Sequence, residues 1–134
     1  MNVYIYNADI YCEDCGEAIR EQITRGGFAP ADPDDESSYD SDEFPKGPCP
    51  DGGGEADYPQ HCGEGPDCLN AIEFDDGHKV GALLENELTT DGIDYVRDAV
   101  REGGEVAELW AEYYSYLFAN VRAITNNPNE VRND

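Results

Sequence analysis

The sequence is poor in positive charge. Only 8 of its 134 residues are Lys or Arg, against 31 Asp or Glu, so the formal net charge at pH 7 is −23. Lysine occurs only at positions 46 and 79. Because proteins bind nucleic acids mainly through Lys and Arg side chains that neutralise phosphates, we expect no direct binding of this chain to DNA or RNA.

Long apolar runs are also missing. No stretch of about 18 apolar residues occurs, which argues against a membrane-spanning helix. We expect no secretory signal either, because no basic segment followed by an apolar stretch opens the chain. We therefore expect a cytoplasmic protein, in which thiols stay reduced. An odd number of cysteines, five, likewise argues against a disulfide scaffold.

Signatures of common catalytic sites are absent from the sequence. It contains no H-E-x-x-H, no G-x-S-x-G, no phosphate-binding P-loop and no G-x-G-x-x-G. Gly52-Gly53-Gly54 is not followed by Lys and Ser or Thr. His61 and His78 supply a residue type for thiol catalysis, but nothing in the sequence brings either beside a cysteine. We therefore expect that the protein is not an enzyme.

An acidic segment rich in proline and glycine occupies about residues 29–60. Between residues 32 and 57 it holds ten acidic residues: Asp32, Asp34, Asp35, Glu36, Asp40, Asp42, Glu43, Asp51, Glu55 and Asp57. A single basic residue, Lys46, accompanies them. Such a stretch has too little apolar surface to offset the entropy of ordering it, so we expect mostly a long loop. Four aromatic residues are candidate anchors of this loop: Phe28, Tyr39, Phe44 and Tyr58.

Three further interpretations of the acidic residues stay open beside a solvated loop. An acidic protein can imitate the charge of DNA and occupy the basic cleft of a nucleic-acid-binding protein. The carboxylates can also bind calcium, although the EF-hand spacing occurs nowhere in the chain. The scarcity of lysine also fits a protein of a saline cytoplasm.

Cys12 and Cys15 form a C-x2-C pair followed by Gly16. Two thiolates at this spacing can converge on one zinc ion at about 2.3 Å in a tight turn. A glycine after the second cysteine lets backbone N–H groups approach the sulfurs without a Cβ clash. The motif therefore predicts the first half of a zinc knuckle.

The second half of this site is expected beyond the acidic loop. Closing the long loop costs only about 1 kcal/mol more than closing one a third as long. Structural zinc contributes on the order of 10–16 kcal/mol in small peptides, so the loop length is no obstacle. The sequence predicts one structural zinc ion held by Cys12, Cys15, Cys62 and Cys68, with His61 or Cys49 as substitutes.

A thiol oxidoreductase is the alternative use of the C-x2-C pair, because a strand, C-x2-C and a helix also occur in thioredoxin-like proteins. No clear βαβ unit surrounds the motif. Glu13 and Asp14 lie between the two cysteines, and negative charge disfavours the thiolate that redox attack needs. A zinc ion stabilises both thiolates instead.

The pattern of apolar residues predicts an α+β fold: a small antiparallel sheet, an N-terminal helix after the zinc knuckle, and a C-terminal pair of helices. A strand is expected at residues 3–6, continuing toward residues 10–11 with a break at 7–9. A helix is expected from Cys15 to Arg25, ended by Gly26-Gly27. The apolar runs 71–74 and 78–84 around Asp75-Asp76-Gly77 predict a hairpin.

The last third of the sequence predicts two helices. Thr90 or Asp91 can cap the first, which should end at Gly103-Gly104. The second should run from about Glu105 to Asn120. We expect a single domain over residues 1–125, and a frayed tail over 126–134. An aromatic cluster that exceeds one helical stripe is a candidate partner surface: Tyr113, Tyr114, Tyr116 and Phe118.

Five segments carry a family resemblance: residues 1–16, 51–57, 58–62, 84–89 and 91–96. They are similar to a group of small uncharacterised phage and prophage proteins with an N-terminal C-x2-C-G motif. Members of that group carry a compact second C-x2-C after a Pro-Gln-His segment, whereas Cys62 and Cys68 here are more widely spaced. The resemblance implies a small accessory protein of a mobile element, bound to zinc.

Taken together, the sequence favours a non-catalytic, zinc-stabilised accessory or interaction module with an unidentified protein partner. An acidic DNA mimic that binds a basic nucleic-acid-binding protein is the second hypothesis, and a C-x2-C oxidoreductase is the third. Salt separates the first two, because a DNA mimic should lose affinity steeply as ionic strength rises. Binding through apolar and aromatic side chains should depend on salt only weakly.

Overall fold

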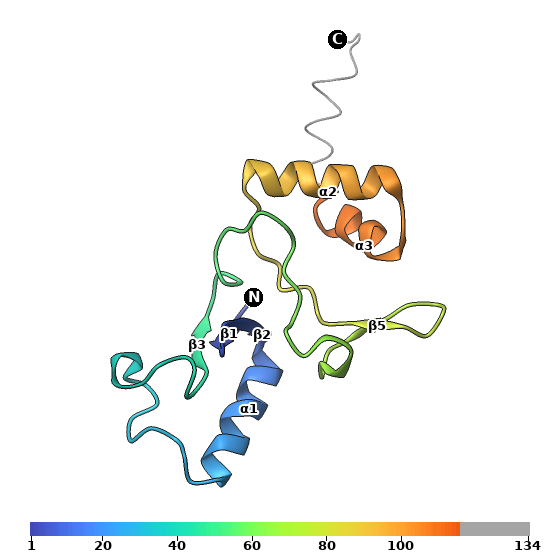
Figure 1. The fold of residues 1–134 in the computed structure, drawn as a ribbon. Coiled ribbons are helices and arrows are strands. Elements are labelled where there is room, and N and C mark those ends of the chain that lie inside the picture. Colours follow the sequence, from blue (N-terminus) through green and yellow to red (C-terminus); the bar gives the residue numbers. More distant parts are fainter. Residues whose placement is uncertain (116–134) are drawn as a thin grey trace.

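A computed structural model describes residues 1–115, and it has the α+β architecture that the sequence predicts (Figure 1). Its strands are β1 (Val3–Tyr6), β2 (Asp9–Cys12), β3 (Lys46–Cys49), β4 (Ile72–Glu73) and β5 (Lys79–Val80). Its α-helices are α1 (Glu13–Arg25), α2 (Thr90–Glu102) and α3 (Glu105–Tyr113). Short 3-10 turns occupy Glu36–Ser38 and Gly65–Asp67.

The N-terminal sheet has the strand order β2-β1-β3, with both pairs antiparallel. Strands β1 and β2 form a hairpin in which Val3 lies opposite Cys12 and Tyr6 lies opposite Asp9. The expected break at residues 7–9 is the turn of this hairpin. Asn7 and Ala8 take left-handed backbone conformations there, with φ of 51° and 63°, as tight hairpin turns require.

Strand β3 lies inside the acidic segment that we expected to be mostly loop. It pairs with β1, with Cys49 opposite Val3 and Lys46 opposite Ile5. The sequence pattern did not predict this strand, because it contains glycine and proline, which are both rare in strands. The N-terminal strand therefore has a hydrogen-bonded partner on each side.

Two of the four expected aromatic anchors do hold the acidic segment. Tyr39 and Phe44 are buried and make an edge-to-face contact at 5.5 Å between ring centroids. The Arg20 guanidinium lies 4.9 Å from the centroids of both the Tyr4 and Phe44 rings, and it donates to the carbonyl oxygen of Pro45. An arginine on α1 thus fixes the acidic segment through cation–π contacts.

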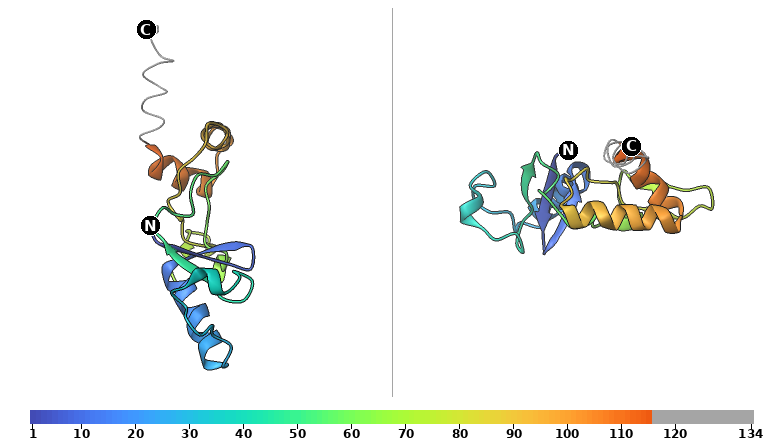
Figure 2. Two further views of the ribbon diagram at one scale, coloured as in Figure 1. Left: turned by 90° about the vertical axis from the view of Figure 1, so that its left-hand side faces the viewer. Right: turned by 90° about the horizontal axis from the view of Figure 1, so that it is seen from above.

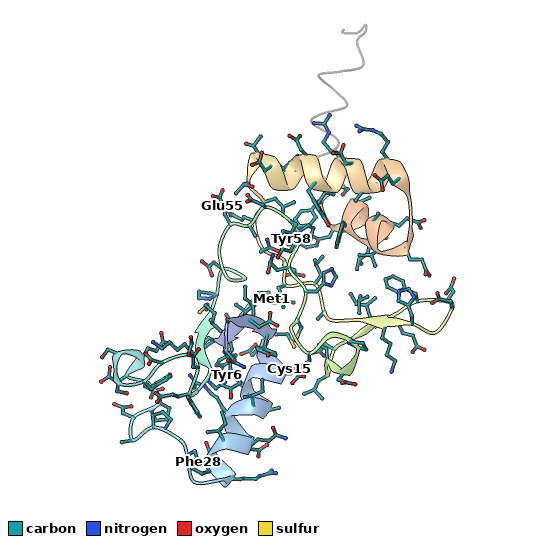
Figure 3. The ribbon with its side chains drawn as sticks, viewed as in Figure 1. Met1, Tyr6, Cys15, Phe28, Glu55 and Tyr58 are labelled. Carbon is teal, nitrogen blue, oxygen red and sulfur yellow. The ribbon has the colours of Figure 1, made fainter. Side chains whose placement is uncertain are left out.

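The other two expected anchors, Phe28 and Tyr58, are exposed. Phe28 lies just beyond the C-terminal end of α1, at the far end of that helix from Cys15 (Figure 3). With 81 % of its surface exposed, Phe28 does not anchor the acidic segment.

The central segment, residues 50–89 between β3 and α2, contains extended stretches that run side by side. Cys62 N donates to Ala82 O at 2.9 Å, and Leu84 N donates to Gln60 O at the same distance. Gly63 N donates to Ile10 O at 2.7 Å and so ties this segment to β2. The predicted hairpin is confirmed, since β4 and β5 pair antiparallel with Ile72 opposite Val80.

Helices α2 and α3 form the predicted C-terminal pair. The N-cap of α2 is Thr89, one residue before the expected positions, and its Oγ1 accepts from Gly92 N at 3.1 Å. Gly103 and Gly104 separate the two helices, because their φ values of 89° and 117° end the helical conformation. Of the predicted second helix, residues 116–120 lie outside the described part, as do Tyr116 and Phe118. Tyr114 is buried rather than available to a partner.

The two helical parts lie at opposite ends of the described chain. Figure 2 shows α1 and the N-terminal sheet at one end and the α2–α3 pair at the other, with the central segment between them. Within residues 1–115, no helix is both long and apolar enough to cross a membrane. Four of the five cysteines lie where the central segment meets the N-terminal sheet and α1.

Candidate metal centre

Four buried cysteines from three parts of the chain meet at one point. Cys12 ends β2, Cys15 lies in the first turn of α1, and Cys62 and Cys68 flank the 3-10 turn of the central segment. Their Sγ atoms all lie within 4.8 Å of one another. Between 3 % and 7 % of each residue's surface is exposed. The structure thus brings together the four cysteines that the sequence singles out.

The spacing of the sulfur atoms fits metal coordination rather than disulfides. Cys68 Sγ lies 3.7 Å from both Cys12 Sγ and Cys15 Sγ, whereas a disulfide joins its sulfurs at about 2.05 Å. Four sulfurs that surround a zinc ion tetrahedrally at about 2.3 Å stand about 3.8 Å apart. The cluster therefore has the size of a tetrahedral metal–thiolate site.

Backbone amides surround this cluster and point at the sulfur atoms. Cys12 N donates to Cys62 Sγ, Leu69 N to Cys15 Sγ and Asn70 N to Cys68 Sγ, each at 3.3 Å. Hydrogen bonds of this kind favour thiolates over thiols. They also orient the ligands around a bound metal. The N-terminus of α1, which begins at Glu13, adds a partial positive charge beside Cys12 and Cys15.

Burial acts against ionisation of the same thiols when no cation is bound. Desolvation raises the pKa of Cys15, and it raises the pKa of Cys62 to about 11. Burial also pushes the pKa of Cys68 upward, but hydrogen bonds from the backbone N–H groups of Ala82 and Asn70, together with those from the side chains of Cys62 and Cys12, outweigh it and lower that pKa. Buried thiolates in such a site need a cation to balance their charge.

The two expected substitutes, His61 and Cys49, lie outside the cluster. Both ring nitrogens of His61 are already engaged: Nδ1 donates to Gly81 O at 2.6 Å, and Nε2 accepts from Trp110 Nε1 at 2.9 Å. Cys49 is half-buried on β3, opposite Val3. His61 thus links the central segment to α3, and sequence proximity to Cys62 is no guide to its role.

Two glycines let the backbone close around the cysteines. A Cβ atom on Gly16 would collide with the ring of Tyr4, and one on Gly81 would collide with the carbonyl oxygen of Cys62. Gly16 therefore allows α1 to approach β1, whereas we expected it to make room for N–H groups at the sulfurs. Gly81 brings the strand before Ala82 against Cys62.

Asn70 links the two halves of the site, and the sequence analysis did not predict it. Its Nδ2 donates to Asp14 Oδ2 at 2.9 Å and lies 3.7 Å from Cys12 Sγ. It thereby joins the first turn of α1 to the segment after Cys68. Its only sequence signal is a position two residues after a cysteine, which is too common to single out one asparagine.

A second group of metal-ligating side chains is exposed at the surface. His78 Nδ1 lies 2.6 Å from Asp76 Oδ1 and 3.6 Å from Glu105 Oε1. Ordinary hydrogen bonding and charge attraction account for this group.

Comparisons of the chain with protein-family models, with curated proteins and with solved structures find no match.

Proposed function

We propose that this protein is a non-catalytic interaction module stabilised by one structural zinc ion. The observation that carries the proposal is the closed, buried set of four thiols at Cys12, Cys15, Cys62 and Cys68. Catalytic zinc sites have three protein ligands and keep one position open for water or substrate, whereas four cysteines complete a tetrahedral shell. A buried shell of this kind supports a structural role.

The position of the cluster explains what the zinc ion does for the fold. It fastens the β1–β2 hairpin and α1 to the central segment, across the 46 residues between Cys15 and Cys62 that include the acidic segment. Structural zinc contributes on the order of 10–16 kcal/mol in small peptides. That is as large as the whole net stability of a typical domain, about 5–15 kcal/mol, so we expect folding to depend on the metal.

The test is native mass spectrometry of the purified protein, with and without a chelator, beside a thermal melt. One zinc per chain and a melting transition that collapses on chelation are expected. The Cys62→Ser variant should lose both the metal and the transition, whereas the Cys49→Ser variant should keep both because Cys49 lies outside the cluster. A metal-free wild-type protein with an unchanged melt would overturn the proposal.

Burial of the thiols counts against the oxidoreductase hypothesis. Redox cysteines are partly exposed and have a lowered thiol pKa, whereas Cys12 and Cys15 are each 3 % exposed and burial raises the pKa of Cys15. A rate of disulfide reduction by the zinc-loaded protein above that of the Cys15→Ser variant would restore this hypothesis.

An acidic decoy for a basic nucleic-acid-binding protein is the second candidate function, and the net charge of −23 favours it. Such a complex should weaken steeply between low and physiological salt. For the zinc-stabilised module we further propose a cytoplasmic location and a role as an accessory protein of a mobile element. A finding that the protein binds no zinc would not count against the decoy hypothesis, because that hypothesis depends on charge and not on the metal.

A further inference from the structure

A cavity of about 360 Å³ lies between α2, α3 and the turn of the β4–β5 hairpin. Figure 1 shows α3 beneath α2, on the side of that hairpin. Tyr95 of α2 and Trp110 of α3 supply aromatic lining, Glu102 and Glu105 supply carboxylates, and His78 comes from the hairpin. No cysteine lines this cavity, so it is separate from the cysteine cluster.

The two aromatic rings are held in a fixed arrangement. The ring centroids of Tyr95 and Trp110 lie 5.9 Å apart, with the ring planes inclined at 48°. Trp110 Nε1 donates to His61 Nε2, which sets the orientation of the indole. Tyr58 packs against Tyr95 at 5.9 Å between ring centroids, and Figure 3 shows it where the central segment meets the helices. Half of the surface of Tyr95 is nevertheless exposed.

Negative charge extends from this cavity to its neighbour. Glu105 also lines a second hollow of about 300 Å³, where Glu73, Asp75, Glu108 and Glu112 surround Phe74 and Leu109. Lys79 lies opposite Glu73 in the β4–β5 hairpin and does not line this hollow. Aromatic faces beside carboxylates attract organic cations, through the ring quadrupole and through charge.

Elsewhere in the protein, aromatic rings already contact one of its own guanidinium groups, that of Arg20. Arg20 lies 4.9 Å from the centroids of both Tyr4 and Phe44 while its Nε and Nη2 donate to the carbonyl oxygens of Pro45 and Gly47. The cation–π contacts among the described residues involve the rings of Tyr4, Phe44 and Tyr39. Tyr95 and Trp110 offer the same chemistry to a cation from outside.

We propose that the cavity between Tyr95, Trp110, Glu102 and Glu105 binds an arginine side chain on an exposed basic segment of a protein partner. The inference rests on the proposed role as an interaction module and supplies the chemistry of its partner. A planar guanidinium suits the site better than an ammonium, because it stacks on aromatic rings and donates in parallel to carboxylates. Further basic residues of the partner would face the second hollow.

The tryptophan gives a direct readout, since Trp110 is the only one in the sequence. The indole Nε1–H resonance is followed by NMR in the zinc-loaded protein during titration with acetyl-Gly-Arg-Gly-Arg-Gly-amide. Two matched peptides replace both arginines by lysine or by citrulline, which keeps the shape of arginine without its charge. A saturable shift is expected with the arginine peptide, a weaker affinity with the lysine peptide, and no shift with the citrulline peptide.

Variants separate the cavity from the overall charge. The double variant Glu102→Gln/Glu105→Gln should weaken arginine-peptide binding about fivefold, and Tyr95→Ala about threefold. The control Glu36→Gln/Glu55→Gln also removes two negative charges, but from exposed positions in the acidic segment. It should change the affinity by less than about twofold. Thermal melts check that each variant is folded.

Three results would overturn the proposal: an unmoved Trp110 resonance in the folded, zinc-loaded protein, an equal or stronger response to the lysine or citrulline peptide, or an equal loss in both double variants. The metal content of the same sample keeps the two proposals apart. Peptide binding by a protein that holds no zinc would remove the zinc proposal and leave this one. One zinc with no peptide response would do the reverse.

Discussion

Single residues decide how closely the N-terminal elements approach one another. Gly16 packs against the ring of Tyr4, which is 3 % exposed and whose hydroxyl lies 3.4 Å from Glu17 Oε2. Because the contact is between the helix backbone and a buried ring on a strand, neither partner can give way easily. The same approach brings Cys15 toward Cys12 and the central segment.

Replacing Gly16 by alanine should therefore destabilise the protein, by about 1–3 kcal/mol, through overpacking against Tyr4. Urea denaturation of the zinc-loaded protein measures the effect. Gly26→Ala is the matched control, because Gly26 has a φ of −74° and its Cβ would meet the exposed ring of Phe28 at 3.3 Å and the carbonyl oxygen of Ile23 at 3.5 Å. Equal midpoints for the two variants would show that the helix does not lie this close to β1.

The thiol pKa values predict how zinc binding depends on pH. Cys15 and Cys62 have pKa values raised above the ordinary 9.0, so both carry a proton at neutral pH and must lose it on binding zinc. Lower pH favours the protonated thiols, and zinc affinity should fall by up to about a hundredfold per pH unit for these two protons. Cys68, whose pKa is lowered, adds less. Competition with a colorimetric chelator at several pH values measures this slope, and a flat profile would contradict protonated ligands.

At the scale of elements, a polar network that is partly buried links the central segment to the C-terminal helices. His61 connects Gly81 with Trp110, and the buried Asn86 accepts from Gln60 N through Oδ1 and from Tyr114 Oη through its backbone oxygen. Buried polar groups need such partners. These side chains fix α3 on the central segment, independently of the cysteine cluster.

The His61→Ala variant should leave zinc binding intact while weakening this link. It leaves the indole N–H of Trp110 and the carbonyl of Gly81 without their partner, a loss of about 1–3 kcal/mol. Zinc content by mass spectrometry and stability by urea denaturation separate the two effects. A loss of zinc in His61→Ala, beyond that in Trp110→Phe, would instead make His61 a ligand.

Elements with a clear apolar period were predictable from the sequence, and those without one were not. The stripes of α1 and α2 and the D-G turn of the β4–β5 hairpin gave the helices and the hairpin within a few residues. Strand β3 has glycine and proline within it, so only pairing with β1 makes it a strand. The C-x2-C motif predicted half of the cysteine cluster, whereas the contacts of Asn70 and His61 depend on tertiary structure.

At the scale of the whole molecule, unbalanced negative charge opposes folding. The ion pairs among the described residues are surface pairs such as Arg25–Glu21 and Arg101–Asp98, both largely exposed. Such pairs contribute little, so most of the 31 acidic side chains repel one another across the surface. The zinc ion that we propose at the cysteine cluster would act against this repulsion, because it would hold the β1–β2 hairpin and α1 on the central segment.

Salt should therefore stabilise the protein. Raising NaCl from about 0.1 M to about 1 M shortens the screening length from about 10 Å to about 3 Å. We expect the melting temperature of the zinc-loaded protein to rise by roughly 5 °C. The variant Glu36→Gln/Glu55→Gln, with two charges fewer, should gain less. An unchanged or lower melting temperature in high salt would mean that charge repulsion is not a major term.

Zinc K-edge X-ray absorption tests the four-sulfur site most directly. Spectra of the metal-loaded protein should fit a single shell of four sulfur atoms at about 2.3 Å, the distance of zinc to thiolates. The Cys49→Ser and His61→Ala variants should give the same spectrum, because neither residue belongs to the cluster. A shell that requires nitrogen or oxygen at about 2.0–2.1 Å, or fewer than four sulfurs, would contradict a site made of Cys12, Cys15, Cys62 and Cys68.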